Sequence, residues 1–164
     1  MTVQALQVAN GETVQKAEME SRSSQMDLRV WVRLLDCVKI VEKRLRRNFQ
    51  SQFGTTLPRF DVMAALHRAP DGLNMGALSR ALLVSNGNVT AIVRQLQEQG
   101  LVSSQADPDD RRSAIVALTQ EGDAQFGVLA AAHHVWVREA LGEFPVERQE
   151  KLLVLLTELK SHLR

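Results

Sequence analysis

The segment from residue 85 to residue 122 constrains the fold most, because it orders a helix, a strand, a charged turn and a second strand. Residues 85–99 place apolar side chains at the i, i+3, i+4 and i+7 positions of one helix face. These side chains are Val89, Ile92, Val93 and Leu96. Ser85 is a favourable N-cap and Gly100 a favourable stop, so the pattern predicts an amphipathic helix with a polar outer face.

Two strands are expected at residues 101–106 and 113–118, and the turn between them reads Asp107-Pro108-Asp109-Asp110-Arg111-Arg112. Such a hairpin points two arginines at solvent beside the polar face of the preceding helix. A polar helix suits the major groove of duplex DNA, and a basic loop suits the minor groove. The segment therefore indicates duplex DNA as a partner.

Upstream, residues 27–53 carry an apolar stripe with helical spacing, and Asp27 and Gly54 are its expected ends. The stripe consists of Trp31, Leu34, Leu35, Val38, Val41, Leu45, Phe49 and Phe53. A helix of this length exceeds what a small core can cover. Part of the stripe is therefore expected to contact a second subunit.

A helix-turn-helix is expected in the middle of the chain. Pro58 opens one helix in its first turn, and residues 69–72 form a turn. Asn74 then caps a short helix with Leu78 and Leu82 on one face. Because a few residues join this short helix to the polar-faced helix that follows, the pair reads as a helix-turn-helix.

Two further helices are expected after the second strand. Thr119 caps the first, which is rich in alanine and runs to about Gly142, and Pro145 opens the second. The last helix is unusually rich in leucine: Leu152, Leu153, Leu155, Leu156, Leu159 and Leu163. Packing against a partner chain is the simplest way to keep such a helix soluble.

The 164 residues fit one domain with appended helices, and 45% hydrophobic residues suffice for a core. The single cysteine excludes an internal disulfide and fits a reducing cytoplasm. No apolar run reaches the ~18 residues of a membrane span. Residues 1–25 are read as a polar, partly disordered tail, with a helix near its end as the alternative.

Enzymatic, cofactor-binding and metal-binding functions find no support in the sequence. It contains no Gly-rich phosphate loop, no His-Glu-x-x-His pair and no nucleophile elbow. His133 and His134 are adjacent, so on a helix they point about 100° apart and cannot readily share an ion. We therefore expect no enzyme activity, no cofactor and no metal.

Together these elements resemble the MarR family (multiple antibiotic resistance regulators), which are dimeric winged-helix transcription factors. The resemblance covers roughly residues 27–164, and its most specific pieces are Ser85-Asn86-Gly87-Asn88-Val89-Thr90, Asp110-Arg111-Arg112, and Leu118-Thr119 with Gly122. It implies a mainly α fold with a small β wing. In this fold a winged helix-turn-helix lies between N- and C-terminal helices, which together form a dimerisation domain.

The expected organisation has four parts. Residues 1–25 form the polar tail, 26–56 a dimerisation helix, 57–119 the DNA-binding lobe and 120–164 the C-terminal dimerisation helices.

The predicted recognition helix should contact DNA through residues that lie off its apolar stripe: Asn86, Gly87, Asn88, Thr90, Ala91, Arg94 and Gln95. Asn and Gln side chains can bond adenine at two atoms, and Arg can do so with guanine. A glycine here would let the backbone approach closely. The alternative is that these positions are ordinary solvated helix positions.

In the wing, the resemblance places Arg112 in the minor groove and makes Asp110 the carboxylate that holds its guanidinium. Narrow minor grooves concentrate negative potential and attract arginine. Arg111 is expected to contact phosphate, and Arg80 in the first helix of the motif is a further candidate phosphate contact. The alternatives are an exposed ion pair in the wing and a solvent-facing arginine at position 80.

Family members usually release DNA when a small ligand, often an aromatic carboxylate or related anion, binds between the dimerisation and DNA-binding lobes. Candidate lining residues by family position are Trp31, Arg59, Met63, His67 and Arg68, although core packing explains Trp31 and Met63 equally well. The predicted function is a ligand-responsive homodimeric repressor. It would bind a pseudo-palindromic operator and be released by an anionic or aromatic ligand, such as an aromatic acid or its CoA thioester.

Two other functions stay open. Cys37 lies in the first helix, where peroxide-sensing relatives keep their reactive cysteine, so a redox switch is one alternative. The sequence has no Tyr to cradle the sulfur as those relatives do, and a buried, inert thiol is the expectation. The other alternative is a winged-helix protein-interaction module without DNA binding, and the paired arginines of the turn argue against it.

Overall fold

The computed structural model describes residues 3–83, 86–107 and 113–163, without the side chains of residues 3–24 and 86. The chain divides into two compact units, Met1–Lys43 and Arg44–Arg164. Helix α1 (Val3–Phe53) supplies the described part of the first unit and continues into the second. The two units are described separately below.

Helix α1 begins at Val3, so the expected helix start at Asp27 is wrong and most of the expected tail is helical. The segment before Asp27 contains no proline and many good helix formers, namely Ala, Gln, Glu, Lys and Met. Its one glycine, Gly11, costs only about 1 kcal/mol relative to alanine in a helix. A polar composition therefore did not prevent helix formation here.

In the first unit, large apolar side chains of α1 are exposed to solvent. They are Met26, Leu28, Val30, Trp31, Val32, Val38 and Ile40. Trp31 is 57% exposed, although it heads the apolar stripe of the sequence.

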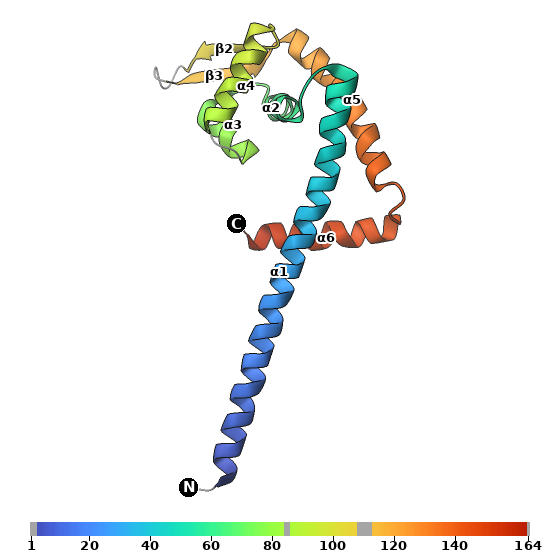
Figure 1. Ribbon diagram of the computed structural model, residues 1–164. Coiled ribbons are helices and arrows are strands. Elements are labelled where there is room, and N and C mark those ends of the chain that lie inside the picture. Colours follow the sequence, from blue (N-terminus) through green and yellow to red (C-terminus); the bar gives the residue numbers. More distant parts are fainter. Residues whose placement is uncertain (1–2, 84–85, 108–112, 164) are drawn as a thin grey trace. The chain divides into compact units, whose positions relative to one another are not determined.

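The second unit is a small winged-helix lobe followed by two long helices (Figure 1). Its elements after α1 are α2 (Leu57–His67), β1 (Leu73–Asn74), α3 (Met75–Leu82), α4 (Asn86–Glu98), β2 (Val102–Ala106), β3 (Ala114–Leu118), α5 (Gln120–Leu141) and α6 (Val146–His162). Apart from β1, this order is the expected one. The mainly α fold with a small β wing is confirmed.

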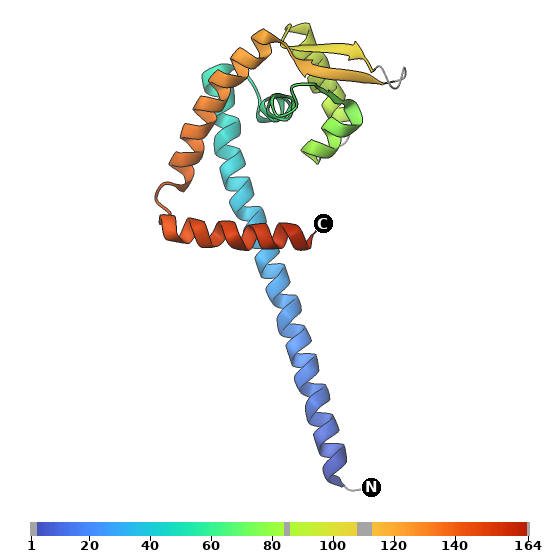
Figure 2. The ribbon, with the colours of Figure 1, turned by 180° about the vertical axis from the view of Figure 1, so that it is seen from behind.

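The sheet is antiparallel with the strand order β1-β3-β2. Strands β2 and β3 pair from Val102 opposite Leu118 to Ala106 opposite Ala114, and the hairpin projects from the helices in both views (Figures 1 and 2). Strand β1 pairs Leu73 with Val116. Two residues are too few to show the alternation that identifies a strand, so the sequence did not predict β1.

Hydrogen bonds confirm the predicted helix starts at Asn74 and Thr119, whereas the expected N-cap Ser85 lies outside the described residues. The Asn74 side chain accepts from the backbone N–H of Ala77 at 2.8 Å. The Thr119 hydroxyl accepts from the backbone N–H of Gly122 at 3.0 Å. Pro58 lies in the first turn of α2, as expected. These caps satisfy N–H groups that a helix start otherwise leaves unpaired.

An aromatic cluster fills the core where α1, α2 and α5 meet. Phe49 is fully buried, and its ring centroid lies 4.9 Å from that of Phe60 and 5.0 Å from that of Trp136. His133 stacks on Phe60 with centroids 4.7 Å apart. Desolvation by burial, with a smaller contribution from the neighbouring His134, lowers the pKa of His133 below 6.5.

Helix α6 contributes no buried residue to its own chain. Its exposed apolar side chains include Leu152, Leu153, Val154, Leu155 and Leu156. Two hydrogen bonds connect its start to the end of α5 and to the loop after it, since Gln149 Nε2 donates to the carbonyls of Leu141 at 3.2 Å and Phe144 at 2.6 Å. This exposure agrees with the expectation that the last helix needs another surface to pack against.

Candidate nucleic-acid interface

Helix α4 is anchored to the lobe by one apolar face. Val89 and Leu96 are fully buried, and Val93 is 4% exposed. These are three of the four residues from which the amphipathic helix was predicted. Because they face the core, the residues between them are turned outward.

The outward face of α4 is polar and open to solvent. Its exposed members are Gly87, Asn88, Thr90, Ala91, Arg94 and Gln95. The helix starts at Asn86, and the side chain of this residue lies outside the description. Amide, hydroxyl and guanidinium groups on one face form the donor and acceptor set that can read base edges. Contact between these side chains and DNA stays a prediction.

Arg94 makes an ion pair that was not predicted from the sequence. Its Nε donates to Glu98 Oε1 at 3.0 Å, one turn further along α4. Both side chains are largely exposed, so the pair contributes no more than about 1 kcal/mol. The i, i+4 spacing of Arg94 and Glu98 was a sequence signal that could have revealed the pair.

The base of the wing is well defined by hydrogen bonds. Beyond the paired strands, Asp107 N–H donates to the carbonyl of Ser113 at 3.1 Å. The wing residues Asp110, Arg111 and Arg112 lie outside the described residues. The antiparallel β2–β3 pairing nevertheless confirms the hairpin on which their proposed role depends.

The turn of the helix-turn-helix contains an unusual backbone conformation. Leu83 ends α3 with φ 55° and ψ 35°, in the left-handed region, and its side chain is 92% exposed. This region is unfavourable for residues with a Cβ. Arg80, the candidate phosphate contact, is exposed on α3.

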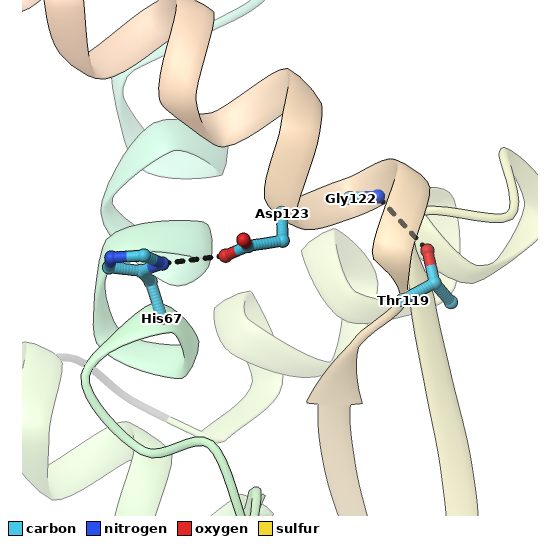
Figure 3. Close-up of polar contacts among 4 residues, drawn as sticks. All are labelled: His67, Thr119, Gly122 and Asp123. Carbon is cyan, nitrogen blue, oxygen red and sulfur yellow. Dashed lines mark hydrogen bonds and ion pairs between the residues drawn. The ribbon is translucent and has the colours of Figure 1, made fainter.

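Two of the expected ligand-binding residues make polar contacts between elements of the second unit. Arg59 donates through Nη2 to Gln99 Oε1, which connects α2 to the residue after α4. His67 Nδ1 lies 2.6 Å from Asp123 Oδ1, so the last turn of α2 meets the first turn of α5 (Figure 3). Partners 40 and 56 residues away leave no local signal in the sequence.

The other three candidate ligand residues differ in exposure. Met63 is 2% exposed and packs in the core, whereas Arg68 is exposed at the end of α2. Trp31 belongs to the unit Met1–Lys43. A 660 Å³ hollow does lie along α5 and α6, where its lining includes Arg138, Leu141 and Val146, and none of the candidates contributes to it.

Cys37 is exposed, so the expectation of a buried thiol is wrong for this chain alone. At 100° per residue, Cys37 lies to the side of the helix stripe through Leu34, Val38 and Val41 rather than on it.

Among the residues described, no three His, Cys, Asp or Glu side chains gather as a metal site would need. Within the same residues, no helix has the length and apolar character to cross a membrane.

Comparisons with known proteins agree with this geometry. A model of the MarR family matches residues 53–113, which span α2 to the wing. The transcriptional activatory protein BadR of Rhodopseudomonas palustris is 29% identical over 139 residues, covering 83% of this chain and 79% of BadR. The HTH-type transcriptional regulator YkoM of Bacillus subtilis is 31% identical over 135 residues, covering 82% and 84%.

Solved structures extend the likeness to the whole fold. A MarR family transcriptional regulator from Silicibacter pomeroyi has a TM-score of 0.74 and 33% identity, covering 86% of this chain and 97% of its own. One from Streptomyces coelicolor, solved in complex with DNA, has a TM-score of 0.73 and 23% identity, covering 82% and 86%. Sequence identity above 30% over more than four fifths of the chain, joined to the same winged helix-turn-helix, makes this chain a member of the MarR family of transcriptional regulators.

Proposed function

We propose that the protein is a homodimeric repressor that binds a pseudo-palindromic operator and releases it when a small anionic or aromatic ligand binds. The observation that carries the proposal is the polar, exposed face of α4 beside the β2–β3 hairpin. In this proposal residues 57–119 are the DNA-binding lobe, and residues 26–56 and 120–164 supply the dimer contacts.

The side chains on α4 divide by the base edges that they suit. Asn88 and Gln95 can each bond adenine at two atoms in the major groove, and Arg94 can bond guanine. Arg94 has to leave Glu98 to do so, and a bidentate bond to guanine is worth more than the exposed ion pair that it replaces.

The wing and α3 supply contacts outside the major groove. We assign Arg112 to the minor groove with Asp110 as its carboxylate partner, and Arg111 and Arg80 to phosphates. Phosphate contacts release counterions, so operator affinity should fall steeply as salt rises.

Dimerisation is supported by apolar side chains that the chain leaves uncovered. These side chains include the exposed leucines of α6. They also include Val128 and Val135 of α5, which are 59% and 50% exposed. Patches of this kind mark interaction surfaces in soluble proteins. A two-fold dimer would read half-sites about one helical turn apart, roughly 10–10.5 base pairs.

The ligand proposal rests on family position together with the character of the residues. Trp31 and Arg68 are exposed in this chain and suit an aromatic ring and an anionic group. We keep Arg59, Met63 and His67 as the remaining candidates. An aromatic acid or its CoA thioester is the ligand class that such residues would take. The relative BadR is described as an activatory protein, so a transcription assay must decide between repression and activation.

Operator binding is tested by titrating duplexes from upstream of the gene with wild-type protein and two variants of α4. Arg94→Ala should weaken specific binding by about 1–3 kcal/mol, or about 5- to 150-fold. Glu98→Gln is the matched control, because it removes the competing carboxylate and should leave binding unchanged or tighter. Equal affinities for wild type and Arg94→Ala would remove this face of α4 from the mechanism.

The wing is tested separately. Arg112→Ala should weaken operator binding several-fold or more without changing the melting temperature. If wild-type protein ignores every duplex even in dilute buffer, the chain is a protein-interaction module instead.

The exposed thiol of Cys37 favours redox control as a second candidate function. Peroxide would then release wild-type protein from DNA but leave the Cys37→Ser variant bound. Equal peroxide sensitivity of the two proteins would exclude it.

A further inference from the structure

We propose that the first turn of α5 is a positioning device that sets the distance between the two DNA half-sites. We call Thr119, Gly122 and Asp123 the α5 anchor. The inference rests on the proposed function, because half-site spacing has meaning only for a dimer on an operator. It goes beyond that function by assigning the control of spacing to three residues that do not face DNA.

The first component of the α5 anchor joins α5 to the end of the recognition helix. The Thr119 hydroxyl donates to the carbonyl of Gly100 at 2.7 Å. It accepts from Gly122 N–H at 3.0 Å (Figure 3). Thr119 N–H also donates to the carbonyl of Leu101 at 3.1 Å. Gly100 follows α4 after a single residue, so one threonine connects the end of α4 to the start of α5.

The second component is a close backbone contact. A Cβ atom added at Gly122 would lie 1.9 Å from the carbonyl oxygen of Leu101, whereas real Cβ contacts essentially never fall below 3.0 Å. The first turn of α5 therefore packs directly against the backbone of Leu101, just before β2. An alanine would have to displace one of them by about 1 Å or more, since backbone cannot rotate away as a side chain can.

The third component fixes α5 against α2. Asp123 Oδ1 lies 2.6 Å from His67 Nδ1, and the His67 ring also packs on Phe126 of α5 with centroids 4.6 Å apart. The Arg59–Gln99 hydrogen bond connects α2 to the end of α4 in turn. Helices α2, α4 and α5 are thus tied to one another pairwise, which leaves α5 little freedom to tilt.

The length of α5 converts a small tilt into a change of register on DNA. Its 22 residues span about 33 Å at 1.5 Å per residue. A tilt of about 5° at the first turn moves the far end by about 3 Å over that length. This distance is close to the ~3.4 Å rise of one base pair. The far end leads to α6, where the apolar residues proposed for dimerisation lie.

The experiment measures affinity for operators whose half-site spacing is changed by one and two base pairs in each direction. The variants are Gly122→Ala, Thr119→Val and Asp123→Asn. Thr119→Ser is the conservative rescue. Gly127→Ala is the matched glycine control, because a Cβ at this other α5 glycine meets nothing within 4 Å. Circular dichroism and sedimentation establish folding and oligomeric state for each protein.

We expect Gly122→Ala and Thr119→Val to lose about tenfold in affinity at the native spacing and to bind a shifted or broadened range of spacings. Binding to an isolated half-site should stay within about twofold of wild type. Thr119→Ser and Gly127→Ala should keep the wild-type preference. If Gly122→Ala does not fold, Thr119→Val and Asp123→Asn decide the question by the same measurement.

A loss of affinity that is equal at every spacing, or an unchanged spacing preference, overturns this inference and leaves the proposed function intact. Absence of binding by the wild-type protein overturns the proposed function, and the inference with it.

Discussion

Replacing Leu83 by glycine should stabilise the protein, although it removes a large apolar side chain. Leu83 has φ 55° and ψ 35°, and its side chain is 92% exposed. A residue with a Cβ pays about 1–2 kcal/mol in this left-handed region, and glycine does not. Truncation loses little hydrophobic burial because almost none of the side chain is covered.

The gain is reduced by the greater freedom of glycine in the unfolded chain, about 0.5–1 kcal/mol. At the midpoints of these two ranges the net stabilisation is about 0.8 kcal/mol. For a protein of this size it raises the melting temperature by roughly 1–4 °C.

The assay is thermal and urea unfolding of wild type, Leu83→Gly, Leu83→Ala and Leu83→Asn at one protein concentration, since the proposed dimerisation would make the midpoint depend on concentration. Leu83→Ala is the control, because it removes the side chain but keeps the Cβ, and its midpoint should stay near that of wild type. Asn tolerates left-handed φ values, so Leu83→Asn should recover part of the gain. A lower midpoint for Leu83→Gly, or an equal gain in Leu83→Ala, would refute the strain argument.

Three further predictions follow from the core and the turns. Phe49→Ala should cost about 3–5 kcal/mol in urea unfolding, because Phe49 is fully buried against Trp136 and other rings. Because the pKa of His133 is lowered in the folded state, the unfolded chain binds more protons below pH 6.5. The stability contribution of His133 is thus complete above pH 6.5 and is lost as pH falls through the lowered pKa. The variant His133→Gln should therefore show a weaker pH dependence of the free energy of unfolding. Gly72→Ala and Gly54→Ala both place a Cβ at positive φ, but only at Gly72 does it meet other atoms, the nearest at 2.6 Å. Gly72→Ala should therefore lower the melting temperature more than Gly54→Ala, and equal shifts would contradict the clash.

Local signals predicted the winged-helix lobe well. Asn74 and Thr119 cap the helices as expected, and strands β2 and β3 each begin within one residue of their expected starts. A cap or a stripe depends on neighbours within one or two helix turns, which the sequence displays directly. The polar face of α4 followed from the same spacing.

Features that depend on distant residues were missed. The His67–Asp123 pair joins residues 56 positions apart, and strand β1 exists only because Leu73 lies opposite Val116. Neither leaves a periodic pattern. The early start of α1 was missed for another reason, because composition alone was read as disorder where helix propensity prevailed.

The uncovered leucines of α6 have a consequence for how this protein is made and maintained. Helix α6 adds no buried residue to its own chain, and in the proposed dimer a second copy would shield it from water. Completion of the fold would then follow second-order kinetics, and dilution would favour unfolding. The number of copies in the cell would then determine how long each molecule stays folded, as well as how much of the operator is occupied.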